Sequence, residues 1–171
     1  IFGGNLTQSQ TDGMNALLDE WEARHPDGDK RWLAYMLATD KWETNATMQP
    51  VKEAYWLSED WRRAHLRYYP FYGRGLVQLT WEDNYRKMGD FIGVDLVGDP
   101  DKALELPIAV TIMFEGMLRA ETKVGDFTGK ALEDYFNDTT DDPLGARRII
   151  NGTDKAHEIA EIHKAFLAAL T

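Results

Sequence analysis

The sequence contains no cysteine, and this excludes disulfides, thiolate metal sites and thiol catalysis. The absence fits synthesis in a reducing compartment, wherever the protein acts. The sequence also has no apolar run long enough to span a bilayer. It opens with Ile1-Phe2-Gly3-Gly4 instead of an initiator Met or a visible signal peptide, so we expect a fragment of a longer chain.

Positive charge is scarce, because 19 Lys and Arg stand against 29 Asp and Glu, for a formal net charge of −10. So acidic a chain is not expected to bind nucleic acid, or to be drawn to an anionic membrane. An anionic substrate would have to be recognised by local hydrogen bonds, aromatic stacking and a few basic side chains. The four histidines are scattered without ligand spacing, so no metal site is expected.

No repeat, low-complexity segment or long linker divides the chain, so residues 1–171 are expected to form one domain. The spacing of apolar residues and the capping signals predict a mainly α fold. In chain order, helices are expected after a Thr7–Gln10 capping box up to His25, from about Lys30 to about Thr44, from Ser58 to about Leu66, from a Thr80 cap to about Gly93, after Pro100, from Pro107 to about Arg119, after Pro143 up to Asn151, and from about Asp154 onward.

Two stretches differ from ordinary amphipathic helices. From Pro107 to about Arg119 the chain is apolar on nearly every side, which predicts a central buried helix. The run Leu76-Val77-Gln78-Leu79-Thr80 has the composition of one short strand, which we expect in a small β-hairpin region.

Most carboxylates in such a chain are solvated surface charges, but Glu43 stands out by its context. It lies near the end of an apolar helix, directly after Trp42. The negative end of the helix dipole and burial against an indole both favour a protonated carboxyl. That is the form a general acid needs at neutral pH. On this context alone, a solvated surface role stays the more common outcome.

A second carboxylate follows ten positions on, since Glu53 lies beyond Pro50 in a stretch that reads as a loop. A loop carboxylate that faces Glu43 can stay ionised and activate a water molecule. Glycoside hydrolysis uses two carboxyls in such unlike surroundings, although many proteins have two glutamates at this spacing.

A block of polar and glycine residues extends from Tyr72 to Thr80, with Arg74 near its start. Gln78 and Thr80 alternate with apolar residues, so both would face one side of a strand. Uncharged hydrogen-bonding groups near aromatic rings suit a sugar, and we assign Tyr72, Arg74 and Gln78 to substrate binding. The alternative is a hairpin whose Thr80 only caps the next helix.

Four segments, in this order, match the pattern of a known family: Ala34–Thr44, Met48–Glu53, Tyr72–Tyr85 and Arg148–Gly152. They resemble glycoside hydrolase family 19, in its short branch of phage endolysins and related bacterial lysozyme domains. Together they extend over most of the chain. The Gly-Arg-Gly-x-x-Gln-Leu-Thr block, with the Asn and Tyr after it, is quite specific.

The resemblance implies a lysozyme-like, two-lobed helical fold with a cleft between the lobes, and an inverting mechanism without metal or cofactor. It implies that Glu43 is the general acid, Glu53 the general base and Thr80 the residue that holds the attacking water. The family's sugar-binding residues match Gln78, Asn84 and Asn151.

The sequence departs from the family in two places. Trp42 replaces the histidine before the acid, so hydrophobic surroundings must replace any tuning by that histidine. No counterpart is identified for the late arginine of plant-type enzymes, and for Arg147 and Arg148 a contact with a helix terminus is favoured over substrate binding. For Trp56 and Trp61, a place in the core is favoured over stacking on sugars.

The leading functional hypothesis is a peptidoglycan hydrolase, a muramidase or lysozyme that cuts β-1,4 bonds between N-acetylmuramic acid and N-acetylglucosamine. The first alternative is a chitinase of the same family, although plant-type chitinases carry cysteines and extra loops that this chain lacks. The second is a non-catalytic cell-wall-binding module, which would not need paired carboxylates.

The hypothesis also predicts where and with what the protein works. We expect a monomer, made in the bacterial cytoplasm, that acts on peptidoglycan strands in the periplasm during phage lysis or as a secreted effector. A further domain, a delivery system, or an immunity or inhibitor protein are the partners to expect.

Overall fold

The computed structural model describes residues 1–118 and 127–171, and its ordered elements are mostly helices, which confirms the mainly α fold class. None of the helices in this part of the chain is both long and apolar enough to cross a membrane. The α-helices are Gln8–Arg24 (α1), Lys30–Glu43 (α2), Glu59–His65 (α3), Glu82–Ile92 (α4), Leu106–Met117 (α5) and Ala156–Leu170 (α6).

Short 3-10 helices complete the helical part at Pro100–Leu104, Leu132–Asp134 and Gly145–Ile149. The helix expected after Pro100 is therefore one 3-10 segment, and the one expected after Pro143 begins only at Gly145.

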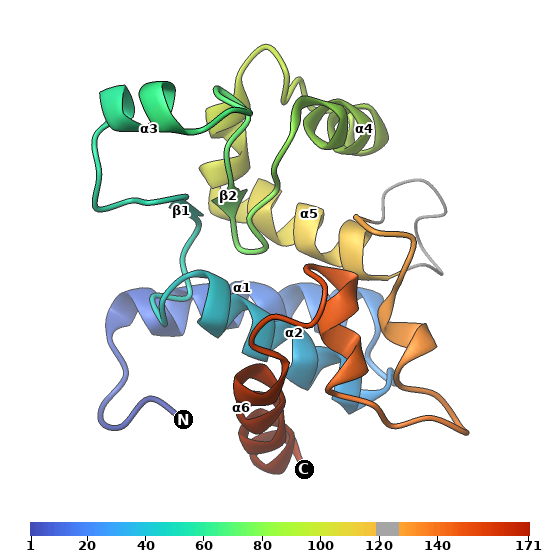
Figure 1. Cartoon of the computed structure of the whole chain (residues 1–171). Coiled ribbons are helices and arrows are strands. Elements are labelled where there is room, and N and C mark those ends of the chain that lie inside the picture. Colours follow the sequence, from blue (N-terminus) through green and yellow to red (C-terminus); the bar gives the residue numbers. More distant parts are fainter. Residues whose placement is uncertain (119–126) are drawn as a thin grey trace.

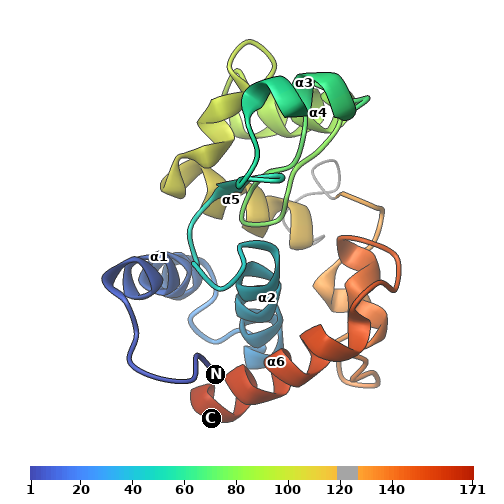
Figure 2. The same cartoon turned by 60° about the vertical axis from the view of Figure 1, so that its left-hand side comes forward.

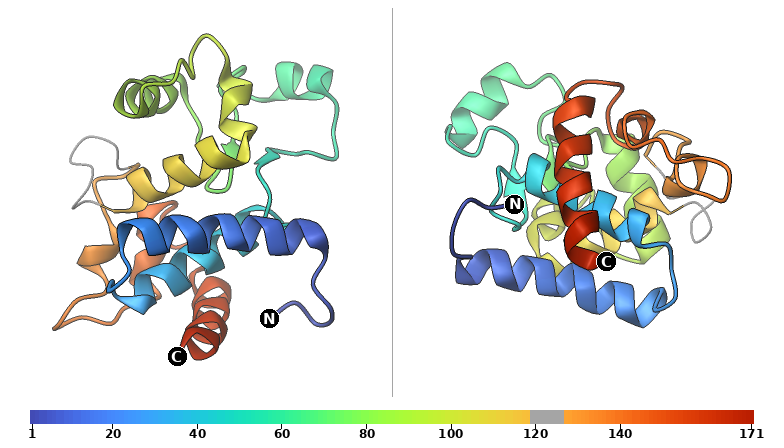
Figure 3. Two further views of the ribbon diagram at one scale, coloured as in Figure 1. Left: turned by 180° about the vertical axis from the view of Figure 1, so that it is seen from behind. Right: turned by 90° about the horizontal axis from the view of Figure 1, so that it is seen from below.

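The elements form two lobes on either side of α5 (Figures 1 and 2). One lobe contains α3, α4 and the two short strands, and the other contains α1, α2 and α6. Helix α6 packs across α2, as the view from below shows (Figure 3). This is the lysozyme-like arrangement that the resemblance implies.

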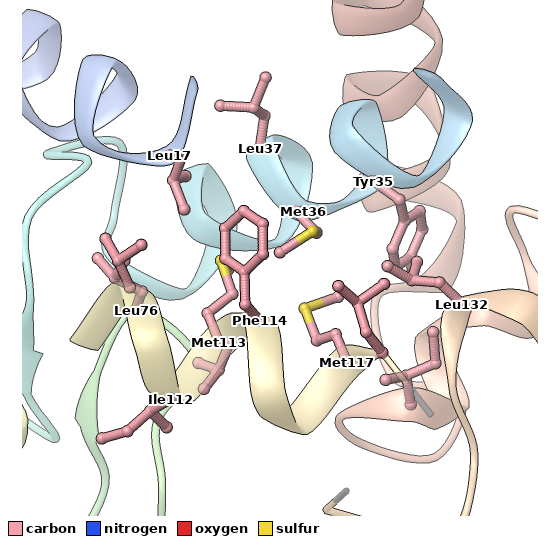
Figure 4. Close-up of a cluster of buried hydrophobic side chains, with 14 of the residues drawn as sticks. Leu17, Tyr35, Met36, Leu37, Leu76, Ile112, Met113, Phe114, Met117 and Leu132 are labelled. Atoms are coloured by element: carbon pink, nitrogen blue, oxygen red, sulfur yellow. The ribbon is translucent and has the colours of Figure 1, made fainter. Parts of the chain in front are cut away.

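Helix α5 is the central buried helix, as the apolar pattern predicts. Its residues from Ala109 onward are buried, apart from Thr111. Figure 4 shows its side chains Met113, Phe114 and Met117 on the side of the helix that faces Met36 of α2. The helix ends at Met117, and the predicted end at Arg119 lies outside the described residues.

The capping predictions hold at two helices. Thr7 Oγ1 accepts from the Gln10 amide at 3.2 Å while Gln10 Oε1 accepts from the Thr7 amide at 2.9 Å, a reciprocal capping box at α1. Ser58 caps α3 by accepting from the amide of Trp61 at 3.1 Å.

The strand predicted over Leu76–Thr80 is wrong. The sheet pairs Val51–Lys52 (β1) with Arg74–Gly75 (β2), antiparallel, and the chain then makes a tight turn. Leu79 returns to pair with Arg74 through two backbone hydrogen bonds, of 3.1 and 2.9 Å. Leu76 and Val77 are both buried although they are adjacent, so the alternation of a strand is broken here. A small β-hairpin region exists, but of different residues.

Candidate active site

A cleft of about 560 Å³ lies between the two lobes. It brings together six predicted site residues, from both halves of the sequence. Its lining consists of Glu43, Glu53, Tyr68, Val77, Gln78, Leu79, Thr80, Trp81, Asn84, Phe127, Thr128, Ile150 and Asn151.

Glu43 is the last residue of α2, a helix whose residues from Leu33 to Asp40 are all buried. The helix therefore acts as a rigid support that delivers the carboxylate to the cleft. The side chain of Glu43 is only 15% exposed, and its Oε1 accepts a hydrogen bond from Arg147 Nη1 at 2.6 Å. The sequence predicts hydrophobic surroundings for Glu43, because Trp42 precedes it. The structure instead places a charged partner, Arg147, against this carboxylate.

Arg147 is a site residue whose role the sequence did not reveal. It is 3% exposed, and its Nε donates to the backbone carbonyl of Asp154 at 2.9 Å, so the guanidinium is held from two sides. The sequence favours a contact of Arg147 with a helix terminus. This is corrected, because the partner of Arg147 is the side chain of Glu43, the predicted acid. Its position directly before the matched segment Arg148–Gly152 was the one signal available. A general acid becomes a carboxylate when it gives up its proton, and a fixed guanidinium stabilises that anion.

We expect Arg147→Ala to lower kcat by about 100-fold, because the anion formed on Glu43 loses its counter-charge. The unpaired carboxylate should also lower the free energy of unfolding by roughly 3–5 kcal/mol. Arg148→Ala is the matched control, because Arg148 is the adjacent arginine and is exposed. Steady-state kinetics and denaturant unfolding of both variants test this, and equal losses at the two positions would contradict it.

Glu53 follows β1 directly, and each oxygen of its carboxylate has a donor. Oε1 accepts from the Tyr68 hydroxyl at 2.6 Å, and Oε2 accepts from the Gly73 amide at 2.9 Å. Burial, followed by the Glu53 contact, raises the pKa of Tyr68 to about 12, so Tyr68 keeps its proton at neutral pH. The carboxylate is thus held in one orientation in the cleft, where it can accept a proton from water.

Thr80, Gln78 and Asn84 are linked by hydrogen bonds along the cleft wall. Asn84 Nδ2 donates to the Thr80 carbonyl at 2.9 Å, and Thr80 Oγ1 donates to the Gln78 carbonyl at 2.8 Å. Gln78 Nε2 donates to the carbonyls of Val51 and Gly75, at 2.9 and 3.2 Å. Since the Thr80 proton is used internally, its hydroxyl presents lone pairs to the cleft and can accept from a water molecule.

The interpretation of Thr80 as a helix cap is wrong. The residue before α4 is Trp81, at φ +74°, and no side chain caps the helix. Gln78 also has a positive φ, of +57°. Gln78 and Trp81 thus both have a positive φ, which is strained for residues other than glycine, and both line the cleft.

Trp81 is a cleft residue that the sequence reasoning did not single out. It is 43% exposed, packs edge-on against Tyr68 with ring centroids 4.9 Å apart, and carries the Arg67 guanidinium 5.0 Å from its ring. An aromatic face of this kind suits the apolar face of a sugar ring. Its place directly after the specific block was the available signal.

Tyr72 and Arg74, assigned to substrate binding, lie elsewhere. Tyr72 is fully buried and Arg74 is 4% exposed, and neither lines the cleft. The Arg74 guanidinium lies 3.8 Å from the Tyr72 ring centroid and donates to Asp101 at 2.9 Å. Both residues support the hairpin from within, which corrects the prediction. A sequence block does not distinguish a residue that lines a site from one that holds it up.

The remaining predicted residue, Asn151, is exposed and lines the cleft beside Ile150, from the lobe opposite Asn84. Among the described residues, no group of three or more His, Cys, Asp or Glu side chains could hold a metal ion. The polar side chains that line the cleft carry carboxylates, hydroxyls and amides, and aromatic and aliphatic side chains complete the lining.

A two-lobed helical protein with two carboxylates in its cleft has the architecture of a lysozyme-like glycosidase. A family model described as chitinase class I matches residues 23–119, more than half of the chain. The chain therefore belongs to glycoside hydrolase family 19, as the motifs predict.

Curated relatives match over short segments only. Chitinase 8 of Oryza sativa subsp. japonica is 56% identical over 32 residues, 19% of this chain and 12% of that protein. Chitinase 11 of the same plant is 49% identical over 39 residues, 23% of this chain and 15% of that protein. The matched segment thus spans less than a sixth of either relative.

Solved structures resemble the whole chain. Chitinase C from Streptomyces griseus HUT6037 superposes with a TM-score of 0.60 at 18% identity, over 99% of this chain and 72% of that one. A bacterial family 19 chitinase gives a TM-score of 0.57 at 21% identity, over 99% and 90%. At these identities the likeness establishes the fold.

Proposed function

We propose that this protein hydrolyses β-1,4 glycosidic bonds next to N-acetylglucosamine, and that chitin-type glycans are its substrate. The observation that carries the proposal is that Glu43, Glu53 and Thr80 line one cleft. The relatives named above are chitinases, which supports chitin over the peptidoglycan predicted from the short-branch resemblance.

The reaction follows from the roles of the three side chains. Glu43 protonates the oxygen of the leaving sugar, and the bond from that oxygen to the anomeric carbon breaks. A water molecule donates one hydrogen bond to Thr80 Oγ1 and gives its other proton to Glu53, while its oxygen bonds to the anomeric carbon. Attack from the opposite face inverts the configuration, so a β bond gives an α product.

The Thr80 hydroxyl gives a sharp test of this step. We expect Thr80→Ser to keep most activity, because the hydroxyl can still donate to the Gln78 carbonyl and accept from water. Thr80→Val should lower kcat by about 100-fold with little change in KM, because the attacking water loses its acceptor. Initial-rate kinetics on a soluble oligomer measure both constants. A Val variant with wild-type kcat would remove Thr80 from the mechanism.

Peptidoglycan is the second candidate substrate. It is favoured by the matched segments, which resemble the short branch of endolysins and bacterial lysozyme domains, and by the absence of the cysteines of plant-type chitinases. In that case the protein would act on the cell wall in the periplasm, during phage lysis or as a secreted effector.

One experiment separates the two substrates. Purified protein is incubated separately with colloidal chitin and with purified sacculi, and the products are analysed by mass spectrometry. Chitin oligomers support the main proposal, and muropeptide fragments with a reducing N-acetylmuramic acid support the second candidate. A proton NMR spectrum of fresh products should show the α anomer, and the β anomer would contradict inversion. No product from either glycan would leave a binding module as the better explanation.

A further inference from the structure

A second hollow, of about 320 Å³, adjoins the main cleft. Glu43, Glu53 and Gln78 line both spaces, so the two carboxylates lie where the hollows meet. A glycan that continued from one hollow into the other would pass beside both carboxylates. The other lining residues of the second hollow are Trp42, Asn45, Val51, Lys52, Ala54, Tyr55 and Trp56.

An exposed aromatic pair forms one wall of this second hollow. Trp56 is 71% exposed, and its ring packs edge-on against Tyr55, with centroids 5.2 Å apart and planes at 88°. The prediction that Trp56 lies in the core is therefore wrong. An indole on a cleft wall exposes an apolar face to water, and covering that face with a ligand is favourable.

The aromatic pair is held in place by its neighbours. Asn45 Nδ2 donates to the Tyr55 hydroxyl at 2.9 Å, which links the turn after α2 to this wall. Asn45 and Ala54 both have positive φ, of +51° and +49°. The chain thus adopts uncommon backbone conformations at two positions that line the hollow.

The charges of the second hollow suit a neutral ligand. Lys52 is the cation in its lining, and its ammonium lies 3.5 Å from Asp101 and 3.9 Å from Glu59. The other charged groups of the lining are the carboxylates of Glu43 and Glu53. An anionic sugar would meet these carboxylates without a free counter-charge in the described lining.

We infer that this second hollow is a saccharide subsite, in which Trp56 stacks on a neutral N-acetylhexosamine unit of the glycan being cut. The inference rests on the proposed function, because it assigns the far side of the same cleavage site. Sugar rings present C–H groups on one face, and these pack on an indole, while Asn45 and the Tyr55 hydroxyl can bond to the sugar's polar groups.

The test compares wild type, Trp56→Ala, Trp56→Phe and Phe91→Ala on the hexamer of N-acetylglucosamine. Trp56→Ala should lower kcat/KM about tenfold and shift the sizes of the products, because one stacking contact is lost. Trp56→Phe should recover part of the loss by keeping an aromatic face. Phe91, which is 39% exposed and lines neither hollow, is the matched control and should behave as wild type. Unchanged kcat/KM and products in Trp56→Ala would overturn the subsite while leaving the proposed function standing.

A binding measurement separates failure of the subsite from failure of the function. The indole N–H signal of Trp56, assigned by its loss in Trp56→Ala, is followed by NMR during titration of the Glu43→Gln protein with the trimer of N-acetylglucosamine. A saturable shift supports the subsite even if the wild type cleaves no glycan, an outcome that would refute only the proposed function. An unmoved signal at saturating trimer overturns the subsite, and an equal shift with free N-acetylmuramic acid overturns its preference for neutral sugars.

Discussion

Glu43→Gln should fold and hydrolyse the glycan about 10²–10⁴-fold more slowly than wild type. Glutamine keeps the shape of the side chain and an oxygen that can accept from Arg147 Nη1, but it has no acidic proton for the leaving oxygen. The loss should fall on kcat, since the amide still occupies the same place in the cleft. The release of new reducing ends, measured with the substrate identified by mass spectrometry, gives the rate.

The matched control for Glu43→Gln is Glu161→Gln, the same substitution at an exposed position of α6 outside the main cleft. It should leave kcat and KM unchanged. Circular dichroism must show that both variants are folded. Arg147 loses its charged partner in Glu43→Gln, so this variant should melt somewhat below wild type. A folded Glu43→Gln protein with wild-type kcat would rule out Glu43 as the acid.

A buried carboxyl in α2 leads to the second large effect, on stability. Asp40 is fully buried, and neither of its side-chain oxygens has a hydrogen-bond partner. The nearby Thr44 hydroxyl donates to the backbone carbonyl of Asp40, at 2.7 Å. Burial raises the pKa of Asp40 from 3.8 to about 8, so the folded protein holds this carboxyl neutral at pH 7.

The sign of the pH dependence follows from the raised pKa of Asp40. The unfolded chain releases this proton near pH 4, whereas the folded chain releases it only near pH 8. Folding therefore takes up a proton between these values, and the free energy of unfolding falls by about 1.4 kcal/mol per pH unit across that window. The contribution is fully present below pH 4, and a total of roughly 5 kcal/mol is lost by about pH 8.

Asp40→Asn should remove this pH dependence, because an amide of the same size does not ionise. Urea unfolding at pH 5, 6, 7 and 8 should show the variant gaining on wild type by about 1.4 kcal/mol per step up to pH 7, and by less in the last step, where the folded wild type begins to ionise. Asp19→Asn, at an exposed position of α1, is the control and should follow wild type. A constant difference between Asp40→Asn and wild type over this range would refute the assignment.

The elements that sequence reasoning predicted well depend on residues a few positions apart. The capping box of Thr7 and Gln10 and the cap at Ser58 each join a side chain to an amide three residues on. The apolar run of α5 is equally local. The strand predicted over Leu76–Thr80 is wrong because the adjacent residues Leu76 and Val77 are both buried. Whether a residue is buried depends on the distant segments that pack against it.

The two carboxylates of the site belong to a motif, while their surroundings come from distant parts of the chain. Arg147 reaches Glu43 across 104 positions, and Tyr68 reaches Glu53 across 15. Conversely, Arg74 belongs to the specific block and yet lies beneath the cleft. A motif records which residues occur together, and it does not record which way each side chain points.

The sequence by itself determined most of the helices, the central place of α5 and the family, because capping and apolar periodicity act over one or two turns and a motif is read in order. It also named Glu43 and Glu53, which the cleft brings together. Only the tertiary structure decided that Arg147 pairs with Glu43, that Arg74 is buried, and that Trp56 is exposed. Burial and ion pairing depend on which surfaces pack together in the folded protein, where the two lobes lie on either side of α5. Arg147 and Glu43 are 104 positions apart and Arg74 and Asp101 are 27 apart, so no local pattern contains this information.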